Sequence, residues 1–173
     1  MLEKEEFNGK ALIFPLMEIE FLKTGVNLKE ADALVSTSVY ALEKLKLELQ
    51  NYKKPIFAVG QRCNKLLQEV GATNTFIYSN VKRLLNGIKY HYRNEQPHVF
   101  YLRGDEISYD LKADLLKQGF NCEEQIVYKQ KRNIQQKELD KILSGKNLEG
   151  IALFSEKSVD SLIKGAASRN LDK

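Results

Sequence analysis

Two stretches of the chain place hydroxyl side chains between a short apolar run and a helix-like pattern. In "ALVSTSV" the run from Ala33 leads into Thr37 and Ser38, and in "ALFSEKSV" the run Ile151–Phe154 leads into Ser155 and Ser158. A hydroxyl at a helix start can cap the helix, and the backbone N–H groups there can bind an anion. The repeated pattern indicates two domains of the same architecture. Its serines either belong to anion sites or act only as helix caps.

The other polar residues limit the chemistry of a site. The chain has no GxGxxG, P-loop, GxSxG or HExxH pattern, and its two histidines, His91 and His98, lack metal-ligand spacing. Its two cysteines form no CxxC pair, and we interpret Cys63 as a small packing residue. Hydroxyl, amide and Arg groups remain. They can bind an anion and exchange a proton, but they do not suit redox or metal-assisted chemistry, so we expect no metal and no cofactor.

Composition indicates a globular protein with a mild preference for anionic partners. Hydrophobic residues make up 43% and charged residues 29%, and the net charge is +4. The basic clusters Lys82–Arg93 and Lys129–Arg132 are compatible with a nucleic-acid surface or with ordinary solvated faces. No apolar stretch reaches membrane-spanning length, and the charged first residues do not resemble a signal peptide. We therefore expect a cytoplasmic protein that does not enter a membrane.

Strand-length apolar runs alternate with amphipathic segments, which predicts parallel βαβ units with helices on both faces of a sheet. Left-handed C-caps are expected at Gly71, Gly119 and Gly145, and a helix N-cap at Asn80. The expected strands are Ala11–Ile19, Ala33–Ser36, Ile56–Val59, Thr75–Tyr78, His98–Leu102, Glu124–Lys129 and Ile151–Phe154, and the expected helices are Ser38–Gln50, Cys63–Glu69, Val81–Tyr92, Ile107–Gln118 and Gln136–Leu143.

Two extended segments, Ala11–Phe21 and Gln125–Arg132, flank the regular block and could pair as an antiparallel ribbon. We interpret them as connectors between domains. The predicted fold is α/β: a flavodoxin-like domain with a parallel sheet, joined by a two-strand connector to a second, similar but incomplete α/β domain. The expected boundaries are 1–27 for the first connector and a remnant of the discontinuous domain, 28–122 for the inserted domain, 123–133 for the return connector, and 134–173 for the rest of the discontinuous domain.

Several stretches, in this order and spacing, resemble the uroporphyrinogen-III synthase family. The resemblance covers most of the chain, so it is more specific than any single match. The stretches are "FPLMEIEFL", "ALVSTSVYAL", "IFAVGQRCNKLLQEVGA", "VFYLRGDEISYDLKADLLKQGF", "QIVYKQ" and "ALFSEKSVDSL".

The resemblance implies two α/β domains with an active site in the cleft between them. It also implies the reaction, which uses no cofactor: hydroxymethylbilane, a small-molecule polycarboxylate, loses water, its terminal ring is inverted, and the macrocycle closes. Such an enzyme is a lyase of porphyrin and heme biosynthesis, which we expect here as a monomer. On the family's pattern Tyr128 is the catalytic hydroxyl, and the substrate-binding positions are Thr37, Ser38, Gly60, Arg62, Arg103, Gly104, Ser155 and Ser158.

The sequence departs from the family pattern in several places. Cys63 and Asn64 replace a Thr-Ala pair, and Lys157 replaces a proline. The resemblance also implies further strand–helix units at both ends, so we expect a shortened member whose own activity is open. The alternative is a non-enzymatic anion- or nucleic-acid-binding α/β module, and nucleic acid is the less favoured partner.

Overall fold

The computed structural model describes residues 11–145 and 148–167. They form two compact units. The larger unit is Ile19–Gln130, and the smaller one contains the described residues up to Glu18 and from Lys131 onward. The parts of the expected domains at 1–10 and 168–173 lie outside the described residues, and the expected domain boundaries stay a prediction. None of the described helices is long and apolar enough to cross a membrane.

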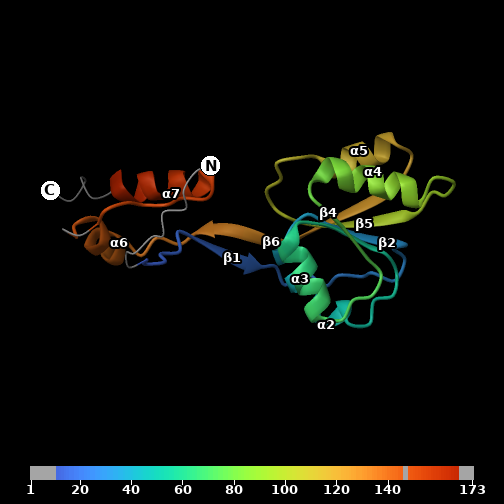
Figure 1. The fold of residues 1–173 in the computed structure, drawn as a ribbon, viewed down its shortest axis with the longest axis horizontal. Coiled ribbons are helices and arrows are strands. Elements are labelled where there is room, and N and C mark those ends of the chain that lie inside the picture. Colours follow the sequence, from blue (N-terminus) through green and yellow to red (C-terminus); the bar gives the residue numbers. More distant parts are fainter. Residues whose placement is uncertain (1–10, 146–147, 168–173) are drawn as a thin grey trace, which may run out of the picture. The chain divides into compact units, whose positions relative to one another are not determined.

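A six-stranded sheet organises the larger unit, in the order β1-β6-β5-β2-β3-β4 (Figure 1). Strands β2 to β6 are parallel along their pairings, which confirms the predicted α/β class. Strand β1 runs antiparallel to β6, because Leu22 N–H donates to Val127 O while Asn133 N–H donates to Leu16 O. The strands are β1 Met17–Phe21, β2 Ala33–Ser36, β3 Ile56–Val59, β4 Thr75–Tyr78, β5 His98–Gly104 and β6 Asn121–Arg132.

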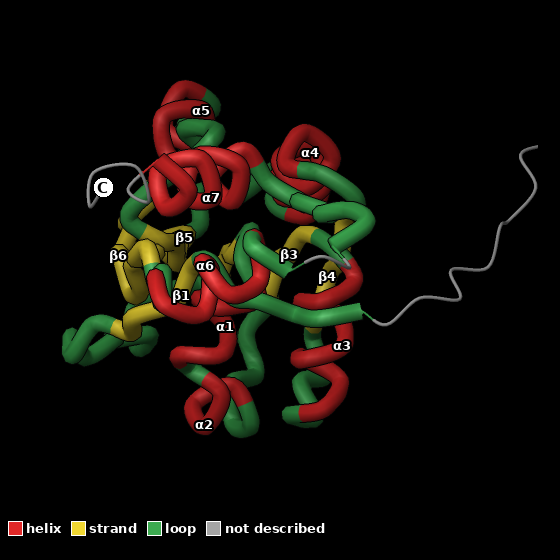
Figure 2. Tube along the Cα trace, turned by 90° about the vertical axis from the view of Figure 1, so that its left-hand side faces the viewer, coloured by secondary structure: helices red, strands yellow, loops and turns green. Residues whose placement is uncertain are grey.

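Helices cover both faces of this sheet (Figure 2). Helices α1, α2 and α3 pack on the face that buries Leu34, whereas α4 and α5 pack on the face that buries Ala33 and Val35. Burial on both faces explains why β2 is apolar at consecutive positions. The helices are α1 Val39–Lys44, α2 Lys46–Leu49, α3 Gln61–Glu69, α4 Val81–His91 and α5 Leu111–Lys117.

The local signals at helix ends are mostly confirmed. The Asn80 side chain accepts a hydrogen bond from Arg83 N–H at 2.9 Å, as expected of an N-cap. Gly71 and Gly119 have the expected positive φ. The same prediction is wrong at Gly145, whose N–H donates to Ile142 O in a turn without positive φ.

The smaller unit contains helices α6 (Gln136–Leu143) and α7 (Glu156–Ala167). A Cβ on Gly165 would lie 2.7 Å from Leu139 Cδ2, so the two helices pack closely at this glycine. The predicted strand Ile151–Phe154 is wrong: this segment is irregular, and the Phe154 side chain is 96% exposed. A strand needs a hydrogen-bonded neighbour, and no described strand pairs with this segment. The expected strand Ala11–Ile19 was predicted to begin too early, since β1 begins only at Met17, after Pro15.

Candidate active site

The order of the parallel strands marks one place for a ligand. If strands β2 to β6 are renumbered 1 to 5 along the chain, their order in the sheet is 3-2-1-4-5. The chain therefore adds β3 and β4 on one side of β2 and then places β5 on its other side. In open α/β sheets, ligands bind at the carboxyl ends of strands at such a switch point. A hollow of about 290 Å³ lies there, and five of the predicted site residues line it: Thr37, Ser38, Arg103, Gly104 and Tyr128.

A pair of hydroxyl groups is the most specific feature of this hollow. Ser38 Oγ lies 2.8 Å from the Tyr128 hydroxyl oxygen. Ser38 occupies the N-cap position of α1, yet its side chain makes no capping hydrogen bond. Its backbone is held instead by Ser36, whose Oγ donates to Ser38 O at 3.0 Å. At this turn the serine therefore orients a tyrosine and does not serve as a helix cap.

An irregularity in the sheet aims Tyr128 toward Ser38. Arg103 pairs with Ile126, but the next residue, Gly104, pairs with Tyr128, so Val127 is an extra residue in β6. Because of this bulge, Val127 and Tyr128 are both buried in the same core although they are consecutive in a strand. Bulges of this kind re-aim side chains beside active sites.

Gly104 provides the space that the tyrosine ring occupies. A Cβ at position 104 would lie 2.6 Å from Tyr128 Cζ. Strand β5 lies between β6 and β2, and neighbouring strands are about 4.8 Å apart. The Tyr128 ring therefore passes over Gly104 to reach Ser38, which follows β2, and a side chain at position 104 would obstruct it.

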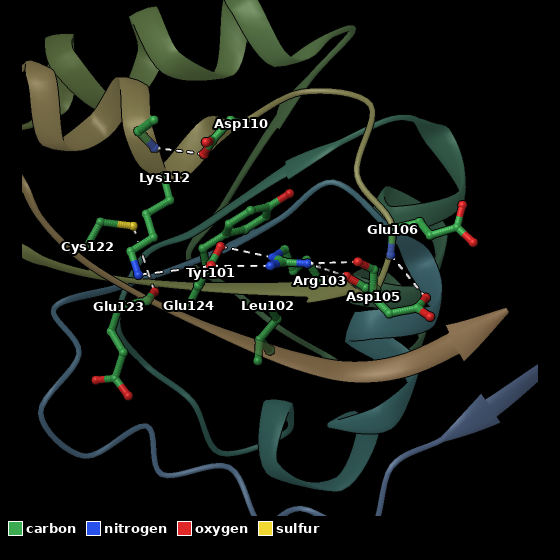
Figure 3. A network of polar contacts seen from close by, with 12 residues as sticks. Tyr101, Leu102, Arg103, Asp105, Glu106, Asp110, Lys112, Cys122, Glu123 and Glu124 are labelled. Atoms are coloured by element: carbon green, nitrogen blue, oxygen red, sulfur yellow. Dashed lines mark hydrogen bonds and ion pairs between the residues drawn. The ribbon is translucent and has the colours of Figure 1, made fainter.

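The Arg103 guanidinium is bound by groups of the protein itself (Figure 3). Nε and Nη2 donate to the two carboxylate oxygens of Glu124 at 2.9 and 3.2 Å. Nη1 donates to Gly104 O at 2.8 Å and to Asp105 O at 3.2 Å. The hydrogen bond to Glu124 is the main reason that the pKa of Arg103 is raised. This geometry favours a role in shaping the loop after β5, and a direct substrate contact of Arg103 stays a prediction.

Gly60 and Arg62 lie beside the site, and Arg62 connects to it through an aromatic contact. Gly60 has a φ of +89° at the start of α3, a conformation that favours glycine. The Arg62 guanidinium carbon lies 5.2 Å from the ring centroid of Tyr40. Tyr40 packs edge-on against Tyr128, with ring centroids 5.7 Å apart. Neither Gly60 nor Arg62 lines the hollow.

Ser155 and Ser158 belong to the smaller unit and form a different kind of turn. Ser158 N–H donates to Ser155 Oγ at 3.2 Å, and the two hydroxyl oxygens are 2.8 Å apart. This is a capping arrangement at the start of α7. The two similar turns of the sequence therefore differ in structure, and the substrate contact of this serine pair remains a prediction.

Sequence reasoning missed three residues around the hollow. The Tyr101 hydroxyl lies 3.2 Å from Thr37 Oγ1, and burial raises the pKa of Tyr101, which keeps its phenol protonated. Tyr101 could have been found, because it precedes Arg103 by two residues and so shares its face of β5. Tyr40 and Glu124 could not have been found from the sequence, because their roles depend on contacts between distant segments.

The described residues contain no group of three His, Cys, Asp or Glu side chains that could hold a metal ion. Cys63 is only 2% exposed, and burial raises its pKa to about 11. A thiol with such a pKa stays protonated near neutral pH, which agrees with its interpretation as a packing residue.

Comparison with known proteins identifies the family. The sequence model described as "Uroporphyrinogen-III synthase HemD" matches residues 2–173. The chain belongs to the uroporphyrinogen-III synthase family. Members of this family are cyclising, lyase-type enzymes of heme biosynthesis that act on a small-molecule substrate, so the enzyme interpretation is supported over the binding-module alternative.

A solved structure is similar in fold. The uroporphyrinogen-III synthetase from Helicobacter pylori 26695 superposes with a TM-score of 0.64 at 23% sequence identity. The similarity covers 86% of this chain and 69% of the other. No curated protein sequence matches the chain.

Proposed function

We propose that the chain converts hydroxymethylbilane to uroporphyrinogen III and that the hollow at the switch point binds the reacting end of this substrate. The family match over residues 2–173 supports the reaction. The Ser38–Tyr128 hydroxyl pair, which lines the hollow at an oxygen separation of 2.8 Å, is the observation that carries the site.

Tyr128 would act where the reaction begins. The C–O bond of the terminal hydroxymethyl group breaks heterolytically, and the departing hydroxyl takes a proton from the Tyr128 phenol and leaves as water. Ser38 Oγ holds the phenol in position and stabilises the resulting phenolate through a hydrogen bond. The remaining azafulvene cation is attacked by a pyrrole carbon, first to the spiro intermediate and then, after rearrangement, to the closed ring. The proton lost on ring closure restores the phenol, so the net change is the loss of one water.

The carboxylates of the substrate need cationic or hydrogen-bonding partners. Arg62 is the better candidate of the two predicted arginines, because its side chain is exposed beside Tyr40 whereas Arg103 is bound to Glu124. An exposed guanidinium can bind a carboxylate through two parallel hydrogen bonds. Thr37, on the lining of the hollow, would provide a hydroxyl contact to a further carboxylate.

The test supplies hydroxymethylbilane to the purified protein and separates the oxidised type I and type III isomers by chromatography. We expect the type III isomer. Formation of only the spontaneous type I isomer would refute the proposed function.

The role of the tyrosine is tested with Tyr128→Phe, which removes the hydroxyl and keeps the ring. Loss of a general acid typically costs about 10²- to 10⁴-fold in rate. We expect kcat to fall in this range while the midpoint of urea unfolding changes little. Tyr90→Phe is the matched control, because Tyr90 is 75% exposed on α4 and does not line the hollow. Equal rates in both variants would exclude an essential Tyr128 hydroxyl.

A further inference from the structure

We propose that Glu124 is a positioning residue for Tyr128, acting through Arg103 and the Gly104–Asp105 backbone. The proposal rests on the function proposed above and deepens it, because it says what holds the catalytic tyrosine in place. Glu124 does not line the hollow, so it has no direct contact with a ligand bound there.

The first link joins β6 to β5. Both carboxylate oxygens of Glu124 accept hydrogen bonds from the Arg103 guanidinium, at 2.9 and 3.2 Å. The two side chains are only 23% and 13% exposed, so the pair is partly shielded from water. The Lys112 ammonium, 4.0 Å from the same carboxylate, adds a second cation from α5 (Figure 3). A bidentate pair of this kind fixes the guanidinium plane.

The second link joins the guanidinium to the backbone that supports the tyrosine. Arg103 Nη1 donates to the carbonyl oxygens of Gly104 and Asp105. Asp105 N–H in turn donates to Tyr128 O at 3.0 Å, and the Tyr128 ring lies against Gly104. The orientation of these two peptide groups therefore determines where the tyrosine backbone and ring sit.

These contacts occur at the bulge, where the register of the two strands shifts by one residue. Without the extra residue, Val127 would pair with Gly104 in place of Tyr128. A slip of one residue turns a strand's side chains to the opposite face of the sheet. It would move the Tyr128 hydroxyl away from Ser38. By holding the residues on the β5 side of the bulge, the Glu124–Arg103 pair stabilises the register that brings the two hydroxyls together.

The test compares Glu124→Gln with Glu123→Gln. Glutamine keeps the size of the side chain but replaces one acceptor oxygen with a donor, so it cannot accept both bonds from Arg103. Glu123 is the adjacent residue of the same strand, and its side chain is 60% exposed. Hydrogen exchange of the Asp105 amide is measured first, because it reports the bond to Tyr128 O without any turnover. We expect exchange about tenfold faster in Glu124→Gln than in the wild-type protein, and unchanged exchange in Glu123→Gln.

Kinetics provide the second measurement. We expect Glu124→Gln to lower kcat by about 10- to 100-fold with KM unchanged, because misplacement of a reacting group by about 1 Å can cost 10²-fold. In a Tyr128→Phe background the same substitution should not lower kcat further, because the hydroxyl group that Glu124 helps to position is then absent. If Glu124→Gln destabilises the fold, Lys112→Met is a milder perturbation, because it removes only the second cation beside Glu124. It should also speed the exchange of the Asp105 amide and lower kcat.

The outcomes separate this proposal from the proposed function. Unchanged Asp105 exchange in Glu124→Gln overturns the positioning role, and so does a loss of kcat that persists in full in the Tyr128→Phe background. If the wild-type protein forms no type III isomer, the proposed function fails, and the exchange measurement still decides whether Glu124 holds this backbone.

Discussion

Replacing Gly104 with alanine is the sharpest single test of the site geometry. The new Cβ would lie 2.6 Å from Tyr128 Cζ and 2.8 Å from both Cε2 and the hydroxyl oxygen. Ordinary contact begins at 3.4 Å, so the ring must move by about 0.8 Å. A displacement of this size along the Ser38–Tyr128 hydrogen bond would lengthen it from 2.8 Å to about 3.6 Å, which is too long for a hydrogen bond.

The expected result is a loss of rate that exceeds the loss of stability. The obstructed ring belongs to a side chain that can move, so the free energy of unfolding should fall by about 1–3 kcal/mol, as for other overpacked sites. The rate of type III isomer formation should fall by about 10²-fold, because the hydroxyl leaves its reacting position. Initial rates by isomer chromatography and urea unfolding of the same preparations measure the two effects.

Gly25→Ala is the matched control, because nothing lies within 4 Å of a Cβ at that position and its φ is not in the left-handed region. Both glycines lie in the larger unit. If Gly104→Ala behaves like Gly25→Ala in rate and in stability, Tyr128 does not need its place over Gly104, and the reasoning about the site is refuted.

Two further predictions follow from individual side chains. The folded-state pKa of Cys63 is about 11 against an ordinary value of 9.0, so the folded protein holds this proton more tightly and its stability should fall between pH 9 and pH 11. The shift corresponds to about 3 kcal/mol at most, and urea midpoints across that range should show a smaller fall in Cys63→Ala. Ser155→Ala should cost about 1 kcal/mol as a lost helix cap, whereas Ser38→Ala should cost less stability but lower kcat. Equal stability losses in the two serine variants would contradict the distinction between the turns.

The bounds of three strands of the sheet were predictable because local signals determine them. The bounds of β2, β3 and β4 coincide with the apolar runs that predicted them, since each run ends at polar or turn residues. The residues of β2 and most of those of β3 are buried, whereas those of the edge strand β4 are partly buried. The same signal failed at Ile151–Phe154. An apolar run becomes a strand only if another strand pairs with it, and pairing depends on residues far away in sequence.

The candidate site was predictable in its residue types and unpredictable in its contacts. Thr37, Ser38 and Tyr128 were singled out as hydroxyl positions, and all three line the hollow. The sequence contains no sign of the bulge at Val127, because a bulge is a property of two paired strands. Without it, alternation places Tyr128 on the opposite face of the sheet from the one that it occupies.

The two similar serine turns show how topology decides what a local pattern does. Both have an apolar run, a serine and a helix start, and Ser155 uses its hydroxyl as a helix cap. Ser38 has the same opportunity but bonds to Tyr128, because the strand order β6-β5-β2 brings the carboxyl ends of these strands together. The tyrosine can cross the intervening strand only at a residue without a side chain, which is Gly104. The chemistry of the first turn thus depends on Gly104, which is distant in sequence, and a bulky residue at position 104 should convert Ser38 into an ordinary helix cap.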